Sequence, residues 1–180
     1  MSILKLNLPT ILTLSRIVLI PFFVLSVYNH PVLGALVFSI ASITDFLDGY
    51  LARRSGQITK FGIIMDPIAD KFLVISALIV LVDMERVSAF AAIILIVRDF
   101  LVTGLRVVAL SKDIVIPAEM GGKLKTTAQI TAVFCLILVG SIFDKLPFDL
   151  YDIGMVFIWI ALVLSVTSGV QYTISFWKKI

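Results

Sequence analysis

The chain has 180 residues, of which 60% are hydrophobic and 15% charged, and its mean hydropathy is +1.11. Soluble globular domains average about 45–50% apolar and about 25% charged residues, so this composition excludes an ordinary soluble domain. One cysteine, Cys135, excludes a disulfide framework within the chain, and one histidine, His30, argues against a histidine-based metal site. The net charge of +3 is modest, so the placement of the charges is more informative than their sum.

Six apolar windows are long enough to cross a bilayer as helices, which takes about 20 residues each. They cover residues 10–29, 33–53, 60–82, 87–110, 124–143 and 152–175. The segment 2–8 is too short to span and is expected along the interface, with Pro9 opening the first long helix. No small-residue cleavage site ends the first window, so we expect it to remain as a span. The sequence predicts an all-α polytopic membrane protein with six transmembrane helices, forming a single domain over residues 1–180.

The distribution of lysine and arginine predicts the orientation in the membrane, because cytoplasmic loops carry an excess of both. With a cytoplasmic N-terminus, the inner side holds Lys5, Arg53, Arg54, Lys60, Lys112, Lys123, Lys125, Lys178 and Lys179. The outer turns then hold only Arg86 and Lys145. We therefore expect both termini to face the cytoplasm.

Four aspartates interrupt two of these apolar windows: Asp45 and Asp48 near the end of the second, and Asp66 and Asp70 near the start of the third. A carboxylate at membrane depth costs on the order of 2.5–3.5 kcal/mol even on the mildest insertion scale. Four such groups would repel one another unless a cation lay among them. The predicted topology places all four toward the cytoplasmic surface.

The spacing of these aspartates favours a metal site. Residues three or four positions apart share one face of a helix, so each pair presents its carboxylates together. Hard oxygen ligands at this density suit Mg²⁺, with Mn²⁺ or Ca²⁺ as alternatives, and two such ions can clamp a pyrophosphate. Two other interpretations remain open at this point: ion coupling in a transporter, and buried ion pairs with Arg98 and Arg106.

The full pattern Asp45-x2-Asp48-Gly49-x2-Ala52-Arg53-x8-Gly62-x3-Asp66-x3-Asp70 resembles the signature of the CDP-alcohol phosphatidyltransferase family at all eight positions. This family transfers a phosphatidyl group from a CDP-linked lipid to an alcohol and releases CMP. The resemblance implies a site on two Mg²⁺ ions with metal ligands Asp45, Asp48, Asp66 and Asp70. It also implies that Asp70 is the general base and that Gly49, Ala52, Arg53 and Gly62 bind the CDP-lipid. Homodimers are common in the family, so the resemblance implies a homodimer here.

Further segments resemble the bacterial phosphatidylglycerophosphate synthases, a branch of this family. They are residues 7–16, Arg98-Asp99, Leu105-Arg106 and Gly122-Lys123-Leu-Lys125-Thr126-Thr127-Ala-Gln129. This resemblance implies CDP-diacylglycerol as donor and glycerol 3-phosphate as acceptor. Asp99 stands where the family commonly has glutamate. Inositol phosphate is the nearest rival acceptor, and a cation-coupled transporter is the alternative of another class.

Glycerol 3-phosphate is a dianion, and its site needs fixed positive charge. We predict that Arg106, Lys123, Lys125 and Arg98 bind the acceptor phosphate, helped by the N-terminus of a helix beginning near Thr126. The two lysines are also typical of topology signals or contacts with anionic lipid. Because Arg98 and Asp99 are adjacent, and so point about 100° apart on a helix, we expect Arg98 to serve a polar face or a neighbouring span instead of pairing with Asp99.

Overall fold

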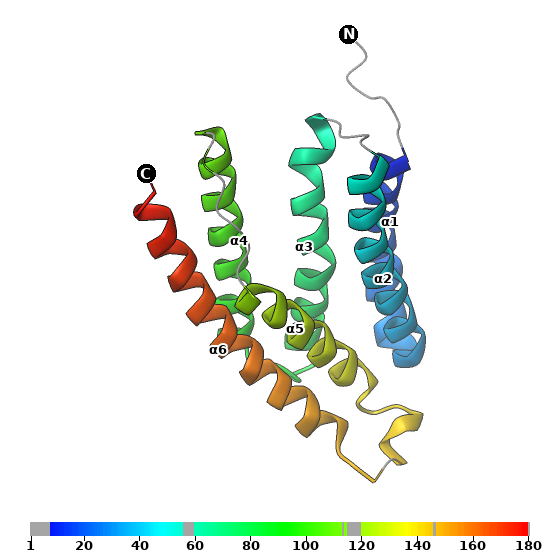
Figure 1. Cartoon of the computed structure of the whole chain (residues 1–180). Coiled ribbons are helices and arrows are strands. Elements are labelled where there is room, and N and C mark those ends of the chain that lie inside the picture. The colour runs from blue at the N-terminus through cyan, green and yellow to red at the C-terminus, as the bar shows by residue number, and fades with distance from the viewer. Residues whose placement is uncertain (1–7, 56–59, 113, 115–119, 146, 180) are drawn as a thin grey trace. The chain divides into compact units, whose positions relative to one another are not determined.

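The computed structural model describes residues 8–55, 60–112, 114, 120–145 and 147–179, with side chains described for 17–44, 71–109, 111–112, 114, 120–143 and 147–179. Within these ranges all regular secondary structure is helical, and there is no strand (Figure 1). The six α-helices are α1 (Leu8–Asn29), α2 (Pro31–Ser55), α3 (Lys60–Asp83), α4 (Ala89–Ser111), α5 (Met120–Leu138) and α6 (Leu150–Trp177), and a 3₁₀ helix η1 covers Ile142–Lys145. The prediction of an all-α chain with six long helices is confirmed.

The fifth helix differs from its predicted range at both ends. It begins at Met120, so the backbone near Thr126 lies inside a helix, and the prediction of a helix N-terminus there is wrong. It ends at Leu138 because Gly140 has a φ of 76°, in the left-handed region that glycine adopts without steric cost. Apolar composition continues past this turn, which is why the sequence window extended to residue 143.

Helix α6 is long and apolar enough to cross a membrane, and it is the one helix in the described part of the chain that satisfies both conditions. Its most apolar stretch has a mean hydropathy of 2.2. Helix α4 is of similar composition but carries Arg98, Asp99 and Arg106 within 23 residues. Six transmembrane helices therefore stay a prediction.

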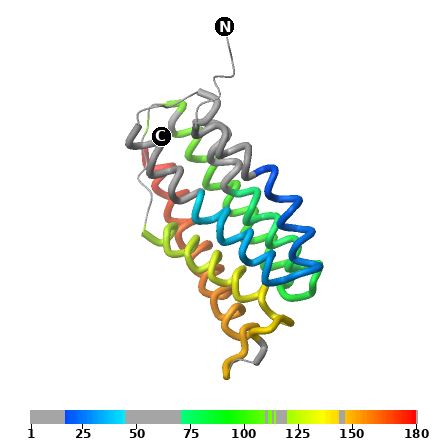
Figure 2. The backbone as a smooth tube through the Cα atoms, turned by 90° about the vertical axis from the view of Figure 1, so that its right-hand side faces the viewer, coloured from blue at the N-terminus to red at the C-terminus, as the bar shows by residue number. Residues whose placement is uncertain are grey.

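The chain divides into two compact units, which are described separately: Met1–Val80 with Ile137–Lys145, and Leu81–Leu136 with Leu146–Ile180. In the first unit α1 and α2 form a helical hairpin (Figures 1 and 2). Pro31 begins α2, a position where the missing N–H of proline costs no hydrogen bond. The two helices touch at Gly34, where a Cβ atom would lie 2.5 Å from Val27 Cγ2. They also touch through the buried side chains of Phe23 and Phe38, whose ring centroids are 5.7 Å apart.

In the second unit α4 packs along α6, and the two are connected by buried apolar contacts. One core cluster joins Val102 and Ala109 of α4 to Tyr172 and Phe176 of α6. These α6 residues are spaced at helical intervals from the other buried ones on the helix, so α6 presents one continuous face to the unit interior.

Helices α5 and α6 approach closely within the same unit, because Gly154 has no side chain to hold them apart. A Cβ atom at Gly154 would lie 2.6 Å from Leu136 Cγ. At this point Arg86 Nη1 donates a hydrogen bond to the carbonyl of Leu136, 2.7 Å away, near the C-terminal end of α5. Asp149 caps the N-terminus of α6 by accepting a hydrogen bond from the Tyr151 amide at 2.8 Å.

The outer faces of α4 and α6 are covered by large apolar side chains. They include Val97, Phe100, Leu101, Val107 and Val108 on α4, and Val156, Trp159, Val163, Val166, Val170 and Ile174 on α6. The buried polar residues of α6, Ser165 and Ser168, instead lie on the inner face. Apolar surface of this extent on a soluble protein would mark an interaction site.

Candidate functional site

The four signature aspartates lie on two helices of the first unit. Asp45 and Asp48 belong to α2, and Asp66 and Asp70 belong to α3. The prediction that each pair shares a single helix is confirmed, so each pair occupies one helical face. Their side chains lie outside the described residues, and the ligand roles of all four stay predictions.

The residues predicted to bind the CDP-lipid lie on the same two helices. Gly49, Ala52 and Arg53 occupy the last turns of α2, and Gly62 the first turn of α3. These four also lie outside the residues whose side chains are described. Their role in binding the CDP-lipid stays a prediction.

Arg98 is the centre of a polar network in the second unit. Its Nε atom donates to the carbonyl of Ser165 at 2.9 Å, and its Nη2 atom donates to Ser168 Oγ at 2.6 Å, so α4 is fastened to α6. Its Nη1 atom lies 3.1 Å from Asp99 Oδ1. The expectation that Arg98 serves a neighbouring helix is confirmed, whereas the expectation that it does not pair with Asp99 is wrong. The long arginine side chain spans the angle between adjacent helical positions, which spacing alone cannot reveal.

Lys125 extends this network to α5. Its Nζ atom lies 2.6 Å from Asp99 Oδ2, and its side chain is only 2% exposed. Asp99 therefore accepts from a cation on each of its two oxygens, and the three side chains together carry a net charge of +1. A buried lysine is stable only when it is paired, so Asp99 fixes Lys125 in place.

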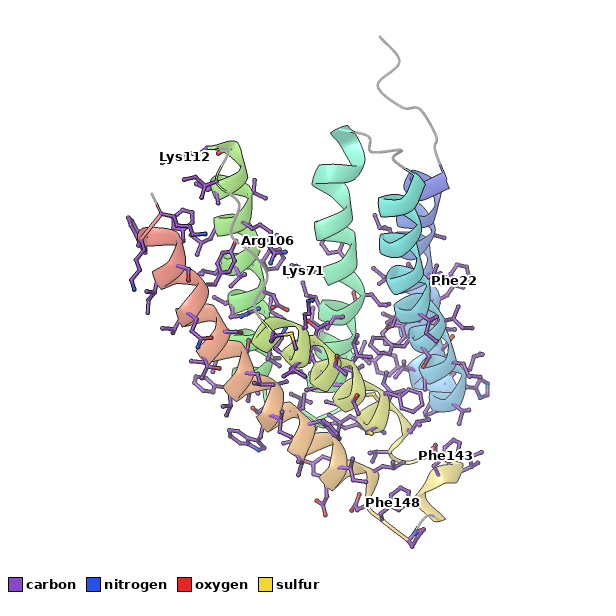
Figure 3. All side chains as sticks on the ribbon, in the orientation of Figure 1. Phe22, Lys71, Arg106, Lys112, Phe143 and Phe148 are labelled. Carbon is purple, nitrogen blue, oxygen red and sulfur yellow. The ribbon has the colours of Figure 1, made fainter. Side chains whose placement is uncertain are left out.

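The other two predicted acceptor residues are more exposed. Arg106 lies on α4 (Figure 3). Its guanidinium carbon is 5.8 Å from the ring centroid of Tyr172, which is a cation–π contact. Arg106 and Arg98 both contact α6, Arg98 at Ser165 and Ser168 and Arg106 at Tyr172. Lys123 is exposed on the first turns of α5. The structure thus joins Arg98 and Lys125 through Asp99 and leaves Arg106 and Lys123 outside that network.

Residues on α6 surround the cations of α4, and the sequence analysis did not identify them. Ser165, Ser168, Gly169 and Tyr172 follow one another at helical spacing on the buried face of a largely apolar helix. Small and polar residues at such intervals in an apolar span are typical of a helix-packing face, and this signal could have located the partners of Arg98. The hydroxyls of Ser165 and Tyr172 are buried and have no hydrogen-bond partner among the described residues.

The sequence profile of the CDP-alcohol phosphatidyltransferase family matches residues 6–167. The chain belongs to this family. The match takes in every signature position and the acceptor candidates on α4 and α5, and it ends at residue 167, within α6.

Proteins similar over almost the whole length include enzymes named CDP-diacylglycerol–glycerol-3-phosphate 3-phosphatidyltransferase. The one from Bacillus subtilis is 40% identical, covering 97% of each chain. The one from Rickettsia bellii is 39% identical over 92% of this chain and 93% of its own, and the one from Haemophilus influenzae is 36% identical over 93% and 92%. Family membership therefore rests on similarity over most of the chain and not on the aspartate signature alone.

Proposed function

We propose that this protein transfers a phosphatidyl group from CDP-diacylglycerol to glycerol 3-phosphate, giving phosphatidylglycerol phosphate and CMP. The observation that carries the proposal is the near full-length similarity to relatives named for this reaction. The two cations that Asp99 joins, Arg98 on α4 and Lys125 on α5, support the choice of a phosphorylated acceptor.

Two Mg²⁺ ions fit the donor set of the signature. Asp45, Asp48, Asp66 and Asp70 supply hard carboxylate oxygens from paired positions on two helices, the ligand type that Mg²⁺ and Mn²⁺ prefer. Bound there, the ions would offset the negative charge of the pyrophosphate and of the leaving CMP. Gly49, Ala52, Arg53 and Gly62 would hold the cytidine diphosphate part of the donor.

The acceptor phosphate would be bound by Arg98, Arg106, Lys123 and Lys125. Arginine matches the geometry of a phosphate with two parallel N–H donors, and Arg98 keeps two of its five N–H groups beyond the three used by described partners. Asp99 reduces the charge of the cluster without removing its positive sign. This arrangement favours a dianionic acceptor over a neutral alcohol such as serine.

The reaction requires one proton transfer and one exchange of phosphorus–oxygen bonds. Asp70 would take the proton from the C1 hydroxyl of glycerol 3-phosphate. The resulting alkoxide oxygen forms a bond to the β-phosphorus of CDP-diacylglycerol, the bond from that phosphorus to the bridging oxygen breaks, and CMP leaves with the electron pair.

The membrane setting follows from the same proposal, since the donor lipid resides in a bilayer. We place six spans at α1 to α6, both termini and the site on the cytoplasmic side of a bacterial membrane, and a homodimer as the working assembly. The apolar outer faces of α4 and α6, with Ser165 and Ser168 buried on the inner face of α6, support membrane-embedded helices.

The deciding experiment is CMP release by purified protein in detergent with CDP-diacylglycerol and Mg²⁺. We compare glycerol 3-phosphate, inositol phosphate, serine and no acceptor, each with and without EDTA. Release that depends on glycerol 3-phosphate and is abolished by EDTA is the expected result. Stimulation by another alcohol alone would replace the acceptor, and no release from folded protein would refute the reaction.

An Asp70→Asn arm in the same assay tests the proposed base. The amide keeps the size of the side chain but cannot accept the proton, so turnover should fall by a factor of about 10² or more. Activity close to that of the unmodified protein would remove Asp70 from this role.

A further inference from the structure

The side chain of Arg98 is held by one turn of α6. Ser165 accepts from Nε with its carbonyl oxygen, and Ser168 accepts from Nη2 with its hydroxyl oxygen. Ser168 donates its own proton to the carbonyl of Leu164, four residues earlier. Its hydroxyl lone pairs are therefore free to face the guanidinium, and the serine is fixed as an acceptor for Arg98.

Gly169 leaves the space that Arg98 occupies. A Cβ atom at this position would lie 3.1 Å from Arg98 Cγ and 3.3 Å from Arg98 Nε, closer than almost all real contacts of this kind. A methyl group here would force the Arg98 side chain to shift by a few tenths of an ångström, and a larger side chain would displace it further from Ser165 and Ser168. By contrast, a Cβ atom at Gly104 of α4 would meet no atom within 4 Å.

The same turn also contacts the start of α5. A Cβ atom at Gly121 would lie 3.3 Å from Ser168 Cβ, so Ser168 packs against the residue four positions before Lys125. This part of α6 therefore accepts the hydrogen bonds of Arg98 and also packs against the start of α5.

We propose that Ser168 and Gly169 are positioning residues that fix Arg98 for the phosphate of the acceptor. Both lie just beyond residue 167, where the match to the family ends. A guanidinium binds a phosphate well only when its planar fork is correctly aimed, and a displacement of about 1 Å can cost on the order of 10²-fold in rate. The inference rests on the proposed function, since it assigns Arg98 to the acceptor.

The test compares Gly169→Ala, Gly169→Val and Ser168→Ala in the CMP-release assay. We expect the KM for glycerol 3-phosphate to rise about threefold for the alanine at 169 and about tenfold or more for valine, in the order of side-chain size. Ser168→Ala should raise it about threefold through the lost hydrogen bond. The KM for CDP-diacylglycerol should stay within about twofold, because the donor is assigned to α2 and α3.

A double variant separates positioning from a general effect on the fold. If Gly169 acts through Arg98, adding Gly169→Val to Arg98→Ala should change the acceptor KM no further, since the displaced group is already absent. Independent, multiplying effects would overturn the proposal. The proposal would also be overturned if the Gly169 variants left the acceptor KM unchanged, or if they raised the KM of both substrates by the same factor.

Gly104→Ala is the matched control, because it adds the same methyl group to a helix where there is room. Thermal unfolding and size-exclusion elution in detergent verify that each variant is folded. Should the valine variant fail to fold, Gly169→Ala and Ser168→Ala carry the same test. If the unmodified protein shows no CMP release dependent on glycerol 3-phosphate, the proposed function fails. If the unmodified protein is active but substitutions at residues 168 and 169 do not change its acceptor KM, only the present inference fails.

Discussion

At the residue scale, the central feature of the second unit is a buried lysine. Lys125 is 2% exposed and lies 2.6 Å from an oxygen of Asp99, which in turn contacts Arg98 at 3.1 Å. Taking a charge out of water is costly, and the pair is tolerable only because the opposite charge is close and hydrogen-bonded. Asp99 thus has a structural task in holding two cations that would otherwise repel each other.

Replacing Asp99 should therefore destabilise the protein. Asp99→Ala removes a carboxylate that contacts two cations, and breaking a buried ion pair in this way typically costs about 3–5 kcal/mol. We expect a fall of several degrees in the midpoint of thermal unfolding in detergent. Asp99→Glu, which keeps the carboxylate, should recover most of the loss, and Asp152→Ala on the exposed first turn of α6 should have little effect. Equal stability of the alanine and glutamate variants would contradict this account.

At the element scale, the α1–α2 hairpin depends on close backbone contact. A Cβ atom at Gly34 would lie 2.8 Å from Val27 Cα and 3.0 Å from Val27 N, so rotation of a side chain cannot relieve the clash and α1 itself must move. This is the reason that glycine occurs inside α2, where it otherwise lowers helix stability.

Alanine substitutions at Gly34 and at Gly104 should consequently have different effects on the midpoint of thermal unfolding. Gly34→Ala gains about 1 kcal/mol of helix propensity but incurs overpacking of about 1–3 kcal/mol with backbone displacement, so the unfolding midpoint should fall. Gly104→Ala gains the same propensity in open space, so the midpoint should rise or stay level. Thermal scans of both variants in one detergent measure the difference, and a midpoint raised by Gly34→Ala would show that the hairpin is looser than described.

The turn after α3 is a second feature at this scale. The amide of Glu85 donates to the Val82 carbonyl at 3.0 Å and that of Arg86 to the Leu81 carbonyl at 2.9 Å, the hydrogen bonds of a Schellman motif. Glu85 has a φ of 57°, in the left-handed region where glycine is normally found.

Glu85→Gly should therefore stabilise the turn. A non-glycine residue in this conformation costs roughly 1–2 kcal/mol, and part of that gain is lost to the greater freedom of glycine in the unfolded chain. We expect a small rise in the unfolding midpoint, whereas Glu85→Ala, which retains the Cβ atom, should give none. If Glu85→Ala raised the unfolding midpoint as much as Glu85→Gly, the cause would be loss of the charge and not relief of the backbone conformation.

At the scale of the whole molecule, the prediction concerns orientation. If both termini are cytoplasmic, the turn between α3 and α4 faces outward and the end of α4 faces inward. In a Cys135→Ser background, Glu85→Cys should react with a membrane-impermeant maleimide on intact cells. Lys112→Cys should react only after permeabilisation. Both side chains are exposed, so burial does not confound the comparison. The reverse labelling pattern would invert the topology and place the proposed site outside.

Sequence reasoning located all six long helices because apolar stretches separated by polar breaks are a property of consecutive residues. It failed at the end of α5, where the apolar stretch continues past Leu138 but the left-handed Gly140 ends the helix. Conformation at a single residue decides such an ending, and hydropathy does not report it.

What the sequence by itself determined is the helical class and the family: its composition indicated helices in an apolar setting, and eight signature positions at fixed gaps predicted the family. Both are encoded over short distances along the chain. The tertiary structure alone decided which side chains meet: Lys125 with Asp99 across 26 residues, and Arg98 with Ser165 and Ser168 across about 70. Spacing along one helix fixes which residues share a face, but contacts between helices depend on packing at small residues such as Gly169, which no local pattern specifies.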